Sequence, residues 1–88
     1  MESVSLLKSG RMKAGKVTLL PGEEIGEHVT ERREEILLIR KGSGILLADG
    51  KSIQLKEGDV HHIPEGVRHN VKNQSQGRLE YIYIVALF

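Results

Sequence analysis

Four histidines are the side chains of this sequence best suited to binding a metal ion. They stand at His28, His61, His62 and His69, and neutral imidazole nitrogen is a ligand for Fe, Mn, Ni, Zn and Cu. The chain has no cysteine, which excludes a thiolate metal site and a thiol nucleophile. Because an isolated histidine more often has a structural or surface role, the residues spaced around each one decide which of the four are candidate ligands.

Two motifs punctuated by glycine and proline contain two of these histidines. The first spans residues 22–42, with its fixed positions at Gly22, His28, Glu35 and Gly42. The second spans residues 58–73, with its fixed positions at Gly58, Pro64, Gly66, His69 and Asn73. Either motif alone would be a weak signal. Paired, with only residues 43–57 between them, they resemble the two motifs of the cupin superfamily as its smallest members carry them.

The resemblance to cupins implies an all-β fold, a small antiparallel jelly-roll β-barrel that is commonly dimeric and holds a divalent metal inside its mouth. It also implies that His28, Glu35 and His69 are the metal ligands. The strand period agrees, because His28 and Thr30 are two residues apart and point to one face of a strand. Two imidazoles and a carboxylate suit divalent Fe, Mn, Ni, Zn or Cu, and three protein ligands leave positions open for water or substrate.

Thr30 departs from the family pattern, because the second histidine of the first cupin motif belongs at its position. Three outcomes are open. The three ligands form a weaker site in which Thr30 hydrogen-bonds a bound water or ligand, or the pocket has lost its metal and binds a ligand without it. In the third outcome His62 supplies the missing imidazole. This requires Val60 to face the barrel interior, since His62 lies two residues further along the same strand, and His61 would then point the other way.

Short apolar segments between turn residues have to position these side chains. Ten glycines and only three aromatic residues favour strands and turns over helices. Asp49-Gly50 between two apolar segments is a strong hairpin signal. The spacing of apolar residues within 23–41 also fits a helix, but glycines interrupt the first turn of such a helix. We therefore expect two strands joined by a solvated turn at Glu31–Glu34. At 88 residues the chain is predicted to form one domain, residues 1–88.

Alternation along the expected strands predicts an apolar pocket wall made of Leu37, Ile39, Val60 and Val71. A wall of this kind favours a small neutral or aromatic substrate. Tyr81 and Tyr83 are expected to pack in the core, with a phenol directed into the pocket as the alternative.

Two segments, residues 36–39 and 81–88, are apolar on both faces of the expected strand. A small barrel has only one interior, so the second apolar face needs other cover. The simplest cover is a partner subunit, and we therefore expect a homodimer.

The net charge of +1 gives no strong field toward nucleic acid or an anionic membrane, and neither is expected as a partner. The N-terminal residues lack the apolar run of a signal peptide, and no apolar run is long enough to span a membrane, so a cytoplasmic location is expected. Two function classes stay open: a small metalloenzyme, such as an oxygenase or isomerase, acting on a small molecule, and a non-catalytic ligand-binding or sensor domain.

Overall fold

The computed structural model describes residues 1–88 as nine strands joined by turns. The strands are β1 (Glu2–Lys8), β2 (Met12–Leu19), β3 (His28–Val29), β4 (Arg33–Lys41), β5 (Gly44–Ala48), β6 (Lys51–Leu55), β7 (Val60–Ile63), β8 (Arg68–Lys72) and β9 (Leu79–Leu87). The predicted hairpin joins β5 to β6, and Asp49 and Gly50 at its tip have φ values of 52° and 73°. No helix of the structure has the length and hydropathy needed to cross a lipid bilayer.

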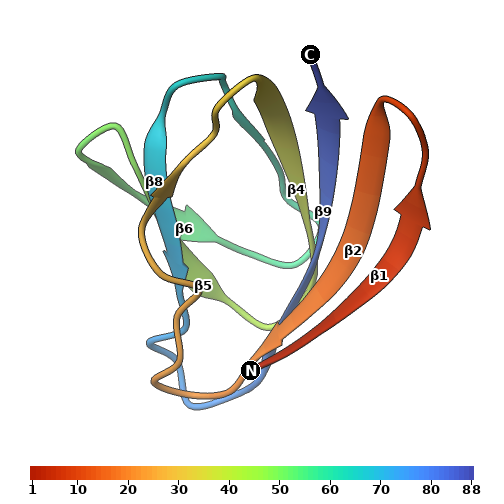
Figure 1. Cartoon of the computed structure of the whole chain (residues 1–88). Coiled ribbons are helices and arrows are strands. Elements are labelled where there is room, and N and C mark those ends of the chain that lie inside the picture. Colours follow the sequence, from red (N-terminus) through yellow and green to blue (C-terminus); the bar gives the residue numbers. More distant parts are fainter.

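All strand pairs are antiparallel and belong to two sheets. The five-stranded sheet has the order β1-β2-β9-β4-β7, and the four-stranded sheet has the order β3-β8-β5-β6. Figure 1 shows the two sheets facing each other, with β9 between β2 and β4. The C-terminal strand thus pairs with two strands from the first half of the chain. The predicted all-β, jelly-roll-like fold is confirmed.

The hydrophobic core lies between the two sheets and follows the alternation of their strands. In β4, Leu37 and Ile39 point inward and are each 1% exposed. Ile36, the residue before Leu37, points to the other face and is 39% exposed. The core unites ten buried side chains from both sheets: Val17, Leu19, Leu37, Ile39, Leu46, Leu55, Ile63, Val71, Leu79 and Tyr81. Burial of each leucine or isoleucine stabilises the fold by about 1.5–3 kcal/mol.

Strand register divides the inner face of the five-stranded sheet into a core end and an open end. One row across β2, β9 and β4 consists of Val17, Tyr81 and Ile39, all of them buried in the core. Another row, four residues away along each strand, consists of Lys13, Val85 and Glu35. Because this second row carries two charged side chains, the functional groups of the sheet lie at the open end.

Asn73 connects the two sequence motifs at the core end. Its side chain is fully buried, and its Nδ2 donates hydrogen bonds to the carbonyls of Leu19 at 2.9 Å and Gly77 at 2.8 Å. Its own carbonyl accepts a hydrogen bond from the N–H of Gly22 at 2.8 Å. The last fixed position of the second motif is therefore bonded to the first fixed position of the first motif, which explains both residues without any role in chemistry.

Gly42 ends the first motif for a steric reason. Its φ is 78°, in the left-handed region, and a Cβ at this position would overlap the carbonyl oxygen of Arg78. Any side chain would therefore have to displace the backbone that leads into β9.

The turn predicted at Glu31–Glu34 is wrong in its second half. The chain reverses at Arg32, whose φ is 56°, and β4 already begins at Arg33. Arg33 pairs with Leu87 at the end of β9. Because β9 continues this far, it offers backbone hydrogen-bonding partners that extend β4 into a segment whose charge favoured a loop.

Candidate metal centre

Three of the predicted ligands meet at the open end of the barrel. His28 on β3 lies directly opposite His69 on β8, and their ring centroids are 4.0 Å apart with 63° between the ring planes. Glu35 comes from β4 in the facing sheet. One ligand atom of each residue lies within 4.8 Å of the other two. The fold thus brings two imidazoles and a carboxylate from both sheets to one point.

Each of these imidazoles is oriented by the backbone carbonyl two residues earlier in the chain. Nδ1 of His28 lies 3.0 Å from the carbonyl of Gly26, and Nδ1 of His69 lies 3.0 Å from that of Val67. Because a carbonyl oxygen only accepts hydrogen bonds, each Nδ1 carries the proton and donates it. In the neutral ring Nε2 then carries the free lone pair, which is the state needed to bind a metal.

Glu35 supplies the negative charge of the group in a nearly dry setting. Its Oε2 lies 3.5 Å from Nε2 of His69, and the two side chains are 13% and 2% exposed. Burial works against the charged form of His69, but hydrogen bonds to Glu35 and to the Val67 carbonyl, with the charge of Glu35, outweigh it and raise the pKa of His69 above 6.5. The point where the three side chains meet therefore favours a positive charge.

This donor set fits a divalent transition metal. Metal–ligand bonds of about 2.0–2.2 Å to nitrogen and oxygen place neighbouring ligand atoms roughly 3–3.5 Å apart. The contact between Glu35 and His69 already has this spacing, and the limit of 4.8 Å on the whole group leaves only a small side-chain movement to make. Two histidines and one carboxylate leave coordination positions open, as a site that also receives a ligand requires.

Thr30 stands at the fourth position of the family motif, but its hydroxyl bonds elsewhere. The side chain is 1% exposed, and Oγ1 donates a 2.8 Å hydrogen bond to the carbonyl of Pro64. The carbonyl of Thr30 accepts a 2.7 Å hydrogen bond from the N–H of Gly66. Thr30 lines the cavity described below, but its two hydrogen bonds join the end of β3 to the turn before β8. Its hydroxyl proton is thus committed to the protein rather than to a bound water.

The third outcome, in which His62 supplies the missing imidazole, does not fit the structure. His62 pairs with Ile36 of β4, on the outer face of the sheet, and its Nε2 lies 2.8 Å from Oε1 of Glu34. Val60, two residues earlier, is 62% exposed, so it does not line the pocket either. His61 takes the inward position on β7, yet it is not one of the residues that converge with the three candidate ligands.

A cavity of about 250 Å³ opens beside the three candidate ligands. Leu37 and Val71 belong to its wall, where the alternation predicted them. Ile39 is 1% exposed and lies in the core, not in the cavity lining. The other apolar residues of the wall are Val17, Ile25, Val29 and Val85.

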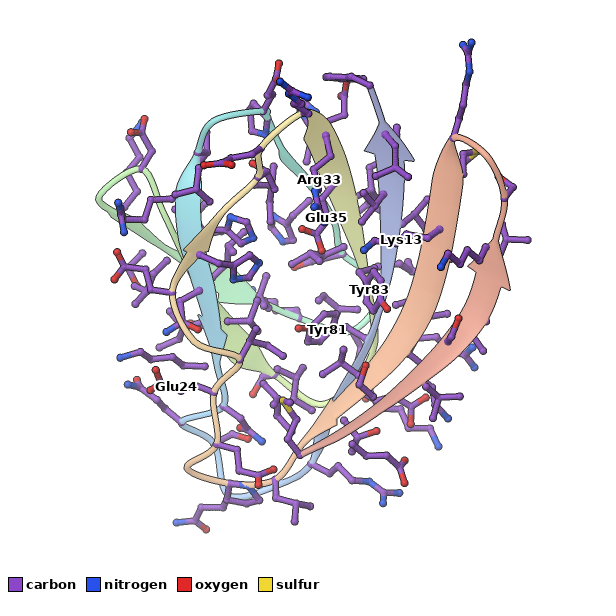
Figure 2. All side chains as sticks on the ribbon, in the orientation of Figure 1. Lys13, Glu24, Arg33, Glu35, Tyr81 and Tyr83 are labelled. Carbon is purple, nitrogen blue, oxygen red and sulfur yellow. The ribbon has the colours of Figure 1, made fainter.

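Polar side chains complete the lining, and two of them were not predicted from the sequence. Lys13 on β2 and Arg33 on β4 both line the cavity. Tyr81 packs in the core and Tyr83 packs against it, as predicted, and both also line the cavity. Figure 2 shows these side chains on β2, β4 and β9 around Glu35, in the space between the sheets. Lys13 lies four residues before the buried Val17 on the same strand, so the strand alternation would have placed its side chain inward as well.

Known proteins with this fold were found among solved structures and family models. A family model described as a cupin domain matches residues 15–85. A predicted oxalate decarboxylase from Thermotoga maritima is 27% identical, with a TM-score of 0.94, over 98% of this chain and 79% of that chain. No curated protein matches the sequence.

Two further structures are similar at lower identity and speak only for the fold. The cupin domain of Cnp3 from Schizosaccharomyces pombe is 21% identical, with a TM-score of 0.93, over 98% of this chain and 64% of that chain. A cupin superfamily protein from Desulfitobacterium hafniense is 23% identical, with a TM-score of 0.90, over 99% of this chain and 77% of that chain. Because the family model spans most of the sequence and includes both motifs, this chain belongs to the cupin family.

Proposed function

We propose that this cupin domain holds one divalent transition metal through His28, Glu35 and His69 and binds a small molecule in the cavity beside it. The observation that supports this most is the convergence of two Nε2 lone pairs, each fixed by an Nδ1 hydrogen bond, with a nearly buried carboxylate. A metal bound there would supply Lewis-acid chemistry to an oxygen-bearing ligand. His28 is exposed and His69 is buried, so the group lies at the cavity mouth, where a small molecule can enter.

The lining favours a ligand-binding or sensor domain over an enzyme. General acid–base catalysis needs a positioned group whose pKa suits proton transfer. The lining holds no carboxylate or imidazole beyond the three candidate ligands, and burial, with the charges of Glu35 and Tyr83, raises the pKa of Tyr81 so that its phenol keeps its proton. An oxygenase-like or isomerase-like metalloenzyme is the alternative, and the description of the Thermotoga structure as a predicted oxalate decarboxylase favours it.

Metal analysis of protein purified without an affinity tag tests the site. We expect about one ion of Fe, Mn, Ni, Zn or Cu per chain, and a loss of metal affinity in His28→Ala and His69→Ala. The loss should exceed the roughly 10–100-fold that removal of an outer hydrogen-bonding partner costs. His62→Ala is the matched control and should keep its metal, because His62 faces outward. A wild-type protein that takes up none of the five metals would contradict the proposal.

We also propose that a second copy of the chain covers the outer face of the five-stranded sheet. The side chains of this face are mainly apolar and include Val4, Met12, Ala14, Ile36, Leu38, Val60, Ile82 and Ile84. Several are well exposed, among them Ile36 at 39% and Val60 at 62%. A mainly apolar patch can pack on its own copy about a two-fold axis, since such an interface uses the same surface twice. The cytoplasmic location stays a prediction from the sequence.

A further inference from the structure

The cavity contains two positive charges that the protein itself does not neutralise. Lys13 and Arg33 are both half-buried and both line the cavity. Neither lies within 4.0 Å of a carboxylate, and the only side-chain hydrogen bond of Arg33 runs from its Nε to the carbonyl of Glu31 at 3.3 Å. Withdrawing a cation from water without a partner costs free energy, so two such side chains in one cavity call for an anion.

Both cations lie close to the candidate metal ligand on β4. Lys13 stands in the same row of the sheet as Glu35, two strands away across β9, which is about 10 Å between backbones. Arg33 lies two residues before Glu35 on the same face of β4, about 7 Å along the strand. Figure 2 shows Lys13, Arg33 and Glu35 in the upper half of the space between the two sheets. Their flexible side chains can therefore meet one acidic group next to the metal position.

The charge balance of the lining makes the preference for an anionic ligand strong. Among its fixed charges are Lys13, Arg33 and a single carboxylate, that of Glu35. Glu35 is already committed to the histidine pair and to the proposed metal. A bound divalent ion would add two further positive charges, so the metal-loaded cavity attracts anions and repels cations.

The rest of the cavity limits the shape of the anion. Its volume of about 250 Å³ corresponds to roughly eight waters at their share of liquid volume, which is the size of an organic acid of about four carbons. Its remaining wall is mainly apolar, through residues such as Leu37, Val71 and Val85, and suits a short hydrocarbon spacer.

We propose that the ligand of this cavity is a small dicarboxylate, with one carboxylate at the metal position and the other held by Lys13 and Arg33. This proposal rests on the proposed function and replaces the neutral or aromatic substrate that the apolar wall suggested from sequence. Arginine and lysine bind carboxylates through charge-assisted hydrogen bonds, and partial burial in the cavity strengthens them.

Isothermal titration of the metal-loaded protein with succinate tests the proposal. We expect succinate to bind at least tenfold more tightly than succinamide, its neutral analogue of similar size. Lys13→Met and Arg33→Met should each weaken succinate binding by about 10–100-fold, the effect of losing one hydrogen bond between charged groups. Lys16→Met is the matched control, because Lys16 lies on the same strand but pairs with Ile82 on the outer face, and it should bind as the wild type does.

Metal content measured on the same samples separates this proposal from the proposed function. Stoichiometric metal with equal binding of succinate and succinamide would overturn the dicarboxylate proposal and leave the metal site standing. If the protein takes up no metal but binds succinate in a way that depends on Lys13 and Arg33, the result would support the anion subsite and overturn the metal site. Binding of inorganic phosphate but not succinate, or identical succinate affinity in Lys13→Met and Lys16→Met, would also overturn the dicarboxylate proposal.

Discussion

Thr30 shows how a single residue can keep a family position while changing its role. Its hydroxyl donates to the carbonyl of Pro64 in a buried setting, and its backbone accepts from Gly66. A histidine here would have been a candidate ligand, whereas threonine stabilises the turn that precedes His69. The loss of one ligand thus leaves the other three supported by the same backbone.

The substitution Thr30→Val separates these two roles. It keeps the shape of the side chain but leaves the Pro64 carbonyl without its hydrogen bond, so we expect it to lower the free energy of unfolding by about 1–3 kcal/mol. Metal content should be unchanged, because Thr30 is not a ligand. Urea denaturation and metal analysis of the same sample measure the two effects. Full metal loss in a variant of normal stability would show that Thr30 belongs to the metal site after all.

The pKa of His69 gives the site a defined pH dependence. Burial lowers the pKa of His69. The hydrogen bonds to Glu35 and to the Val67 carbonyl, together with the charge of Glu35, raise it by more. Since the folded-state pKa lies above the ordinary value of 6.5, the contribution of this proton to stability is full below pH 6.5 and is lost as the pH rises through the raised value.

Metal binding is expected to show the opposite trend, because a metal on Nε2 of His69 has to displace the proton. Zn²⁺ affinity should therefore rise with pH through and above 6.5 and level off once His69 is neutral. Competition with a coloured chelator at several pH values measures it. An affinity that stays constant across this range would mean that His69 is not a ligand.

At the scale of elements, a glycine on β2 makes room for a tyrosine of the cavity lining. The ring and hydroxyl of Tyr83 on β9 lie directly against Gly15, and a Cβ at Gly15 would overlap them. Because Gly15 has no side chain, the Tyr83 ring can lie across the inner face of β2.

Gly15→Ala should push the Tyr83 ring toward the cavity and destabilise the fold by about 1–3 kcal/mol, the usual cost of overpacking. The metal should be retained, because its ligands come from β3, β4 and β8. Gly10→Ala is the control, since no atom lies within 4 Å of a Cβ there, and its effect should stay within about 0.5 kcal/mol. Equal denaturation midpoints for the two variants would contradict the packing of the Tyr83 ring on Gly15.

Local sequence patterns predict strands better than they predict which face of a strand is buried. Alternation within β3 and β8 correctly placed His28 and His69, because each belongs to a motif with turns at fixed positions. In β7 the prediction depended on Val60, a β-branched residue that is exposed. Ile63, 1% exposed, sets the register instead and turns His62 outward with Val60. Both residues are apolar, and only the packing of the facing sheet decides between them.

At the scale of the whole molecule, the sequence predicts the family, the all-β fold and the three converging residues, because two spaced motifs carry them. Two charged residues of the cavity were missed because neither is a fixed position of the motifs. Lys13 precedes the apolar part of β2, and Arg33 lies in a segment whose charge favoured a turn. Alternation back from Val17 places Lys13 inward, whereas the inward direction of Arg33 depends on the pairing of β4 with β9, a contact between distant parts of the chain.

The apolar outer sheet face gives a test of the assembly. Ile36 lies on β4, beside Ile84 of β9, and Ile36→Lys should convert a dimer to a monomer by placing a charge in the interface. Leu20→Lys is the control, since Leu20 is 50% exposed but lies in the turn after β2, away from this face. Light scattering measures the mass of each. A wild-type monomer at micromolar concentration, or equal behaviour of the two variants, would contradict the dimer.

The central claim is that His28 and His69 bind one metal through Nε2 while donating their Nδ1 protons to backbone carbonyls. Long-range ¹H–¹⁵N correlation spectra of the histidine side chains, recorded while Zn²⁺ is added to the protein, test it most directly, because they report each ring nitrogen separately. We predict that the Nε2 signals of His28 and His69 shift together until one Zn²⁺ per chain is bound, with Nδ1 still protonated, while His61 and His62 stay unchanged. Shifts at His61 or His62 alone, or no shift at any histidine, would contradict the account.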